Sequence, residues 1–127
     1  MKVLLSIKPE YADRIFSGEK KYEFRRTIFS RPDVDEVVIY ETSPVKRIVG
    51  SFTVKKVHKY KPAVLWKKTR EYAGIDEKHF FEYFRGCDTA YAIEIGDVKR
   101  YESPINPWEN VNFVPPQSFV YYDKVRI

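Results

Sequence analysis

The feature that most constrains the fold is a long stretch, Val45–Tyr60, in which apolar and polar residues alternate. The apolar residues that share one face of an extended chain are Ile48, Phe52, Val54 and Tyr60. The polar face carries Arg47, Ser51, Thr53, Lys55 and Lys59. A period of two predicts a strand with one face toward a core and the other toward water. We therefore expect a sheet protein, which also suits an aromatic content of 17%.

Shorter patterns flank this stretch on both sides. Further strands are expected over residues 3–7, 20–26, 34–42, 89–98 and 118–122. Helices are expected from Pro9 to a left-handed cap at Gly18, over 62–72, and over 77–84 between Asp76 as N-cap and Gly86 as C-cap. The order β-α-β-β-β-α-α-β-β favours mostly antiparallel pairs, and a closed or half-closed small barrel would protect their edges.

Length and charge narrow the class of protein. A chain of 127 residues with 43% hydrophobic residues fits one globular domain, residues 1–127. The net charge is +5, and Pro44–Arg70 holds nine basic residues and no acidic one. Such an uneven distribution predicts a positive face, which favours polyanionic partners such as nucleic acid.

Other residue types exclude several functions. The single cysteine, Cys87, cannot form an internal disulfide and suits a reducing, cytoplasmic setting. We see no leader and no apolar run of 18 residues, so neither secretion nor a membrane span is expected. His58 and His79 lack partners at a metal-ligand spacing, and no glycine-rich phosphate loop is present. We therefore expect neither a metal nor a cofactor; the oligomeric state stays open.

Charged residues are densest between Gly18 and Arg26, where six of nine side chains are ionisable as acids or bases. In a strand, Lys21, Glu23 and Arg25 share one face, and Lys20 lies at the junction with the preceding helix. A carboxylate flanked by cations stays ionised and holds them in a fixed geometry. Such a cluster can bind phosphate or a base edge. The alternative is an ion-paired strand face in solvent.

The spacing Gly-x-Lys-x-x-Glu-x-Arg, formed by Gly18, Lys20, Glu23 and Arg25, resembles the signature of the ASCH domain. Companion patterns extend the resemblance to small stand-alone archaeal and bacterial ASCH proteins over nearly the whole chain: Ser6-Ile7-Lys8-Pro9, Tyr40-x-Thr42-Ser43-Pro44, Trp66, Ala90-Tyr91-Ala92-Ile93 and Pro115-Pro116-Gln117-Ser118-Phe119. The resemblance implies a β-rich α+β fold, a PUA-like small β-barrel with flanking helices. It also implies a cleft that holds the signature residues and binds RNA or a modified base.

Polar residues at strand ends or beside proline turns are expected to complete the rim of this cleft: Ser6, Lys8, Tyr40, Thr42, Gln117 and Ser118. In that cleft Gln117 can read a base edge and Tyr40 can stack, although each residue can instead cap a turn. Trp66 is either a stacking platform or a helix anchor.

These patterns support a nucleic-acid-binding module, for RNA rather than DNA. Lys20, Arg25 and Arg26 would contact phosphate or base, and Glu23 would orient them. The alternative is a metal-independent enzyme acting on RNA or nucleosides, with Lys20, Glu23 and Ser118 as catalytic candidates. A third hypothesis is a small-molecule-sensing regulator, which the absence of an obvious DNA-reading helix disfavours.

The resemblance also covers enzymes, which differ in how well they match. One ASCH group hydrolyses N4-acetylcytidine with a lysine equivalent to Lys20 and a threonine nucleophile three residues later. This chain has Glu23 at that position, which disfavours the same mechanism. Another ASCH relative resembles a ribonuclease, and in such an enzyme Lys20 with Ser118 would be a base–nucleophile or charge-stabilising pair.

Overall fold

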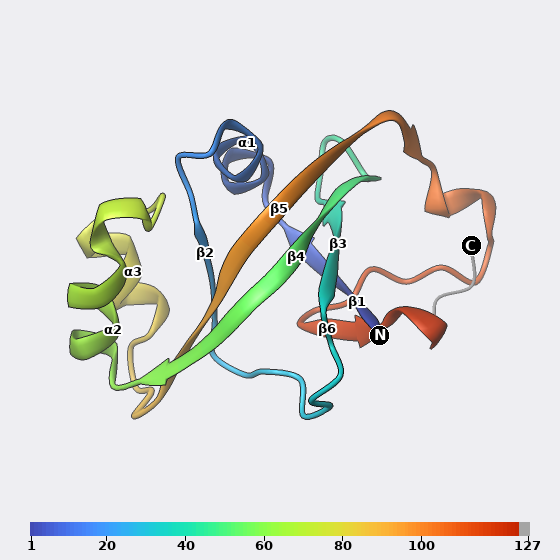
Figure 1. Cartoon of the computed structure of the whole chain (residues 1–127). Helices are drawn as coiled ribbons and strands as arrows, with labels where there is room; N and C mark the ends of the chain where they lie inside the picture. Colours follow the sequence, from blue (N-terminus) through green and yellow to red (C-terminus); the bar gives the residue numbers. More distant parts are fainter. Residues whose placement is uncertain (125–127) are drawn as a thin grey trace.

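The computed structural model describes residues 1–124, without the side chain of Lys124. Six strands form one sheet in the order β2-β5-β4-β3-β1-β6, which curls into a half-barrel (Figure 1). The strands are β1 (Lys2–Ile7), β2 (Tyr22–Arg25), β3 (Glu36–Glu41), β4 (Arg47–Tyr60), β5 (Ala90–Ile105) and β6 (Phe119–Tyr121). In the described sheet β1 pairs with β3 in parallel, and the other neighbouring pairs are antiparallel. This confirms the expected β-rich, PUA-like architecture.

Three α-helices flank the sheet: α1 (Pro9–Ser17), α2 (Pro62–Thr69) and α3 (Glu77–Tyr83). Short 3-10 turns are η1 (Arg70–Tyr72), η2 (Pro107–Glu109) and η3 (Tyr122–Lys124). Figure 1 shows the long strands β4 and β5 crossing the molecule side by side, with α2 and α3, which are inserted between them in the chain, at one end and the C-terminal segment at the other. This insertion places α3 beside β2.

Local sequence signals account for the helix ends. Gly18 ends α1 in the left-handed conformation, at φ 86°. The Asp76 carboxylate accepts a hydrogen bond of 2.8 Å from the backbone N–H of His79 and so caps α3. The predicted C-cap at Gly86 is wrong, because α3 ends at Tyr83 with Phe84 as its C-cap, and Gly86, at φ 80°, belongs to the following turn.

The alternation predicted for β4 holds only in part. Ser51, expected on the solvent face, is 5% exposed, and the whole run Ile48–Phe52 is buried. The pairing of β4 with β5 shifts register at three places, and both faces of the central strand are covered in this region. β5 is also longer than expected and continues to Ile105, through Pro104.

Buried apolar side chains of the described chain form three clusters. The first packs α1 against β1 and β3 on one face of the sheet. The second joins α2 and α3 to the end of β2 and β5, where Trp66 packs on Phe80 with ring centroids 5.0 Å apart. Trp66 therefore acts as the helix anchor. The third covers the opposite face of β1 and β3 with Phe113 from the C-terminal segment.

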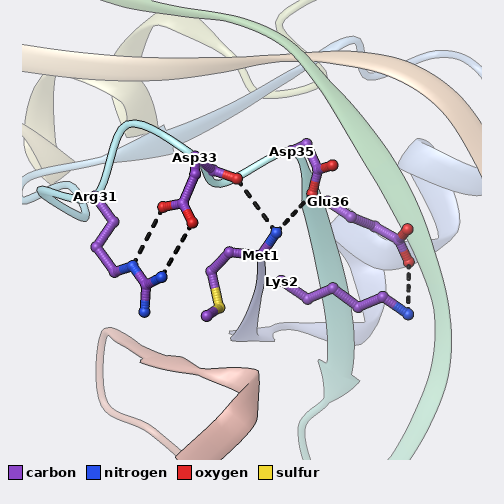
Figure 2. A network of polar contacts seen from close by, with 6 residues as sticks. All are labelled: Met1, Lys2, Arg31, Asp33, Asp35 and Glu36. Atoms are coloured by element: carbon purple, nitrogen blue, oxygen red, sulfur yellow. Dashed lines mark hydrogen bonds and ion pairs between the residues drawn. The ribbon is translucent and has the colours of Figure 1, made fainter.

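A polar network connects the start of β1 to the segment before β3 (Figure 2). The amino group of Met1 lies 3.3 Å from both the Asp33 carbonyl oxygen and the Asp35 carboxylate, and Lys2 pairs with Glu36 at 3.7 Å. Arg31 holds Asp33 through two hydrogen bonds of 3.2 and 3.0 Å. These pairs are largely exposed and screened by solvent, so they orient the segment more than they stabilise the fold.

Candidate functional site

A cavity of about 400 Å³ opens between β2 and α3. Its walls come from the end of β1, the start of α1, β2, and the segment from Ile75 through α3. The lining residues are Ser6, Ile7, Lys8, Tyr11, Lys20, Glu23, Phe24, Arg25, Ile75, His79, Glu82 and Tyr83. The volume falls within the range of small-molecule and nucleotide pockets.

A buried ion pair forms one wall of this cavity. Nη2 of Arg25 lies 3.0 Å from Oε2 of Glu23, and the two side chains are only 11% and 9% exposed. Within the described chain, Arg25 Nε is a buried donor without a hydrogen-bond partner. Breaking such a pair from one side strands the other charge, which costs ~3–5 kcal/mol. A buried ion pair is weak evidence for stability, and a buried donor without a partner calls for an explanation, so this cluster is a candidate functional site.

Arg25 also connects the two edges of the half-barrel. It lies on the edge strand β2, yet its guanidinium donates to the carbonyl oxygens of Ser6 in β1, at 3.0 Å, and of Ser118 just before β6, at 3.4 Å. The hydroxyls of Thr27 and Ser118 meet at 3.1 Å across the same gap. The Ser6 hydroxyl donates to the Pro116 carbonyl at 2.7 Å. The C-terminal segment therefore reaches the charged cluster through its backbone.

Lys20 is the other buried cation of the site. Its side chain is 3% exposed, its Nζ donates to the Ala73 carbonyl at 2.7 Å, and it lies 4.6 Å from the centre of the Phe24 ring. Burial lowers the pKa of Lys20 from 10.5 to about 8, although the nearby Glu23 carboxylate opposes the shift. Near pH 8 the amine therefore exchanges readily between its charged and neutral forms.

The segment Tyr72–Gly74 holds Lys20 in place. The backbone N–H of Lys21 donates to the Tyr72 carbonyl at 2.8 Å, and Arg14 donates to the Gly74 carbonyl at 2.8 Å. Gly74 adopts φ +64°, and a Cβ added there would lie 2.4 Å from Cβ of Lys20. Only glycine allows the backbone this close to the lysine stem.

The structure brings half of the expected site residues together. Five of them line the cavity: Ser6, Lys8, Lys20, Glu23 and Arg25. Ser118 adjoins it through its contacts with Arg25 and Thr27. The remaining four do not line it: Arg26, Tyr40, Thr42 and Gln117.

Tyr40 and Arg26 need correction. Tyr40 is 2% exposed, packs against Phe113, and accepts a hydrogen bond of 3.2 Å from Trp108 Nε1, because the C-terminal segment folds over this face of β3. It cannot stack on a ligand there. The exposed Arg26 side chain donates to the Tyr83 carbonyl at 2.6 Å, with its guanidinium 4.3 Å from the centre of that ring, and does not itself line the cavity.

The other two residues also lie elsewhere. Thr42 belongs to the turn after β3, where its N–H donates to the Ile7 carbonyl at 3.0 Å, so it serves the turn rather than the cavity. Gln117 is exposed beside the C-terminal proline pair.

Sequence reasoning missed the wall formed by α3. His79, Glu82 and Tyr83 all line the cavity, and they stand at positions i, i+3 and i+4 of one helix. This spacing puts them on a single helical face. The signal was therefore present in the sequence, but the aromatic residues around it indicated only core packing.

The basic segment found in the sequence is almost entirely on the surface. Of the nine basic residues between Pro44 and Arg70, all but Arg47 are exposed. Most of them follow the second half of β4 and continue along α2, beside the end of the sheet that carries α3. Their distribution gives this end of the molecule a positive surface that can hold a phosphate backbone.

Two further properties bear on the site. Within residues 1–124, no group of three or more His, Cys, Asp or Glu side chains is arranged to hold a metal ion. No helix in that part of the chain is long and apolar enough to cross a membrane.

Comparison with known proteins identifies the family of this chain. The family profile of the ASCH domain matches residues 5–115. The ASCH domain-containing ribonuclease of Zymomonas mobilis is 31% identical over 128 residues, which cover 95% of this chain and 84% of the relative.

Solved structures agree with the sequence match. The crystal structure of the Zymomonas mobilis ASCH protein superposes with a TM-score of 0.88 at 32% identity, covering 97% of this chain and 88% of that one. Its tyrosine-to-phenylalanine and serine-to-alanine variants superpose equally well. A hypothetical protein, PH0355, shares the fold alone, with a TM-score of 0.54 at 23% identity over 83% of this chain and all of the other.

Proposed function

Because the chain belongs to the ASCH domain family, we propose that it acts on RNA and holds one nucleotide in the cavity beside Lys20, Glu23 and Arg25. The observation that carries this proposal is the buried cluster of two cations and one carboxylate at the wall of a nucleotide-sized cavity. The relative named as a ribonuclease supports RNA as the partner. The free thiol of Cys87 suits a cytoplasmic protein, which is part of the proposal.

The lining residues suit the different parts of a nucleotide. Two carbonyl oxygens and Glu23 hold the Arg25 guanidinium in place, so its remaining N–H donors can bind a ligand with little loss of side-chain entropy. Lys8, exposed at the mouth, can meet a phosphate that enters. Glu23 and Glu82 present carboxylates, which accept from the exocyclic amines of bases. The rings of Tyr11 and Tyr83 offer apolar surface to the base.

Salt dependence tests the binding mode. If about four phosphates meet Lys8, Arg25 and the exposed lysines of α2, Lys67 and Lys68, the affinity for a short single-stranded RNA should fall about 50-fold between 50 and 200 mM salt. Fluorescence anisotropy with a labelled RNA octamer, repeated with DNA of the same sequence, measures both the slope and the preference. An affinity that does not respond to salt, or no binding at low salt, would contradict the proposal.

Cleavage of the bound RNA is the second candidate function, favoured by the ribonuclease relative and by the lowered pKa of Lys20. In this reaction Glu23 accepts the proton of a ribose 2′-hydroxyl as its oxygen forms a bond to phosphorus. The bond from phosphorus to the 5′-oxygen breaks, and the Lys20 ammonium supplies a proton to that leaving oxygen. Arg25 stabilises the charge that develops on the phosphoryl oxygens.

This mechanism predicts products with 2′,3′-cyclic phosphate ends. We expect cleavage to survive a chelator, to fail on RNA with a 2′-deoxy sugar at the cleaved position, and to drop at least ~100-fold in Glu23→Gln. Mass spectrometry of the products identifies the new ends. Glu77→Gln, on an exposed side chain outside the cavity, is the matched control and should keep full activity. Intact RNA after long incubation with the wild type would leave binding alone as the function.

A further inference from the structure

A second cavity, of about 560 Å³, lies on the other side of Lys20. Its walls are the connection from Gly18 to Tyr22, the middle of β4 around Thr53 and Lys55, and the stretch of β5 from Glu94 to Val98. Lys20 is the one residue that lines both cavities within the described chain, so the two hollows adjoin. The proposed function assigns no role to this second hollow.

A network of polar contacts surrounds Glu94 in the wall of the second cavity. Glu94, 22% exposed, is held by His58 through a 2.7 Å hydrogen bond and pairs with Lys55 at 3.5 Å. The hydrogen bond from His58 is the main cause that lowers the pKa of Glu94, so the carboxylate is ionised at neutral pH. Lys55 is 69% exposed, and its ammonium group stays accessible to a ligand.

Gly96 and Thr53 pack closely against each other in the wall of this cavity. At Gly96, a Cβ would meet the Thr53 hydroxyl oxygen at 2.4 Å, and that oxygen already accepts a hydrogen bond of 2.8 Å from the backbone N–H of Asp97. The exposed lining residues are Gly18, Lys21, Thr53, Lys55, Gly96, Asp97 and Val98. Among the described residues, this mouth carries two cations, Lys21 and Lys55, and one carboxylate, Asp97, and the buried Lys20 is a wall residue of both cavities.

We propose that the second cavity binds the neighbouring nucleotide of the same RNA chain. This inference rests on the proposed function. Lys21 and Lys55 contact the phosphate of that nucleotide, while the Glu94 carboxylate accepts a hydrogen bond from its ribose 2′-hydroxyl. A 2′-hydroxyl is the group by which a protein distinguishes RNA from DNA at a given position. His58 orients Glu94 for this contact and acts as a positioning residue.

The chain offers a matched control for the cation. Lys55 lines the second cavity, whereas Lys56, the next residue in β4, is exposed and does not line it. Lys55→Gln and Lys56→Gln therefore remove the same charge from neighbouring positions. The probes are a nucleoside monophosphate, a dinucleotide, and the same dinucleotide with 2′-deoxyribose at either position, measured by calorimetry.

For the wild type we expect the dinucleotide to bind more tightly than the monophosphate. Lys55→Gln should weaken binding of the dinucleotide about fivefold and leave the affinity for the monophosphate unchanged. It should also lower the magnitude of the slope of log affinity against log salt concentration by about 0.7 for the dinucleotide. Lys56→Gln should change neither by more than about twofold. Glu94→Gln should abolish the preference for ribose over deoxyribose at one position only. Circular dichroism confirms that each variant is folded.

Two results would overturn the second site and leave the first intact. One is equal weakening of the dinucleotide by Lys55→Gln and Lys56→Gln, which would indicate a diffuse charge effect. The other is equal affinity of the wild type for monophosphate and dinucleotide. A wild type that binds none of the probes would instead defeat the proposed function itself, so the two failures are distinguishable.

Discussion

Lys20→Met should lower the RNA affinity, and any cleavage rate, by at least ~100-fold while the protein remains folded. Methionine keeps an unbranched, apolar stem between Phe24 and Tyr11, whose ring centres lie 4.6 and 5.4 Å from Nζ of Lys20. It removes the cation that faces Glu23 and Arg25. Lys78→Met, on an exposed residue of α3 outside the cavity, is the control and should bind RNA normally.

The pH dependence separates the roles of Lys20 in function and stability. Its pKa is about 8 in the folded protein, against 10.5 for a lysine side chain in water, so the ammonium form that holds phosphate prevails below pH 8. RNA affinity should therefore decline as the pH rises through about 8 in the wild type, and this transition should vanish in Lys20→Met.

Stability should change in the opposite direction. Between pH 8 and 10.5 Lys20 is protonated in the unfolded chain and mostly neutral in the folded protein. The free energy of unfolding therefore increases as the pH rises through this range. At pH 7 burial of the charged amine costs stability, whereas Lys20→Met leaves the Ala73 carbonyl without its donor. We expect the free energy of unfolding of Lys20→Met to lie within ~2 kcal/mol of the wild-type value at pH 7. A loss of more than twice that amount in urea unfolding would show that Lys20 is structural.

Gly74→Ala has the second large effect, on both stability and RNA affinity. The residue adopts φ +64°, and the new Cβ would lie 2.4 and 2.6 Å from Cβ and Cγ of Lys20. The strain of the positive φ costs ~1 kcal/mol, and relief of the steric contact requires Lys20 or the segment 72–74 to shift at a further cost of ~1–3 kcal/mol. The displaced amine should weaken RNA binding at least ~10-fold.

Gly86→Ala separates the cost of a positive φ from the cost of the steric contact with Lys20. Gly86 has a similar φ of +80°, but nothing lies within 4 Å of an added Cβ. This control should lose only the ~1 kcal/mol of backbone strain and bind RNA as the wild type does. Equal losses of stability and of RNA affinity in the two variants would refute the role of Gly74 as the support of Lys20.

The sequence predicted those elements whose signals are local. Gly18 ends α1 and Asp76 caps α3, because a cap depends on a few neighbouring residues. The charged segment on β2 and the half-barrel likewise follow from spacing and from alternation along the chain. Residue contacts between distant segments were predicted less well.

Tyr40 illustrates this limit. The continuous apolar run in β3 shows that both faces of the strand are covered, but the segment that covers Tyr40 comes from around Phe113, about seventy residues later. Nothing near Tyr40 in the sequence distinguishes a buried ring from a stacking one. Its hydroxyl accepts from Trp108 instead of facing a ligand.

Lys20 and the wall of α3 illustrate the same limit at the site itself. A lysine at a helix–strand junction is usually exposed, and the burial of Lys20 depends on the segment 72–74, whose position is set by the insertion of α2 and α3 between β4 and β5. The same insertion brings His79, Glu82 and Tyr83 to the cavity. Sequence spacing placed the charges on β2 but could not supply the wall opposite them.

An NMR titration with a short RNA tests the central claim most directly. Amide resonances of the ¹⁵N-labelled protein are followed as an RNA tetranucleotide is added, at low salt and pH 7. We predict large shifts at residues 6–8, 20–25 and 75–83, around the cavity between β2 and α3, with further shifts at 53–55 and 94–98 where the neighbouring nucleotide binds. Shifts that avoid these segments, or none at all at saturating RNA, would contradict the assignment of this cavity as the RNA site.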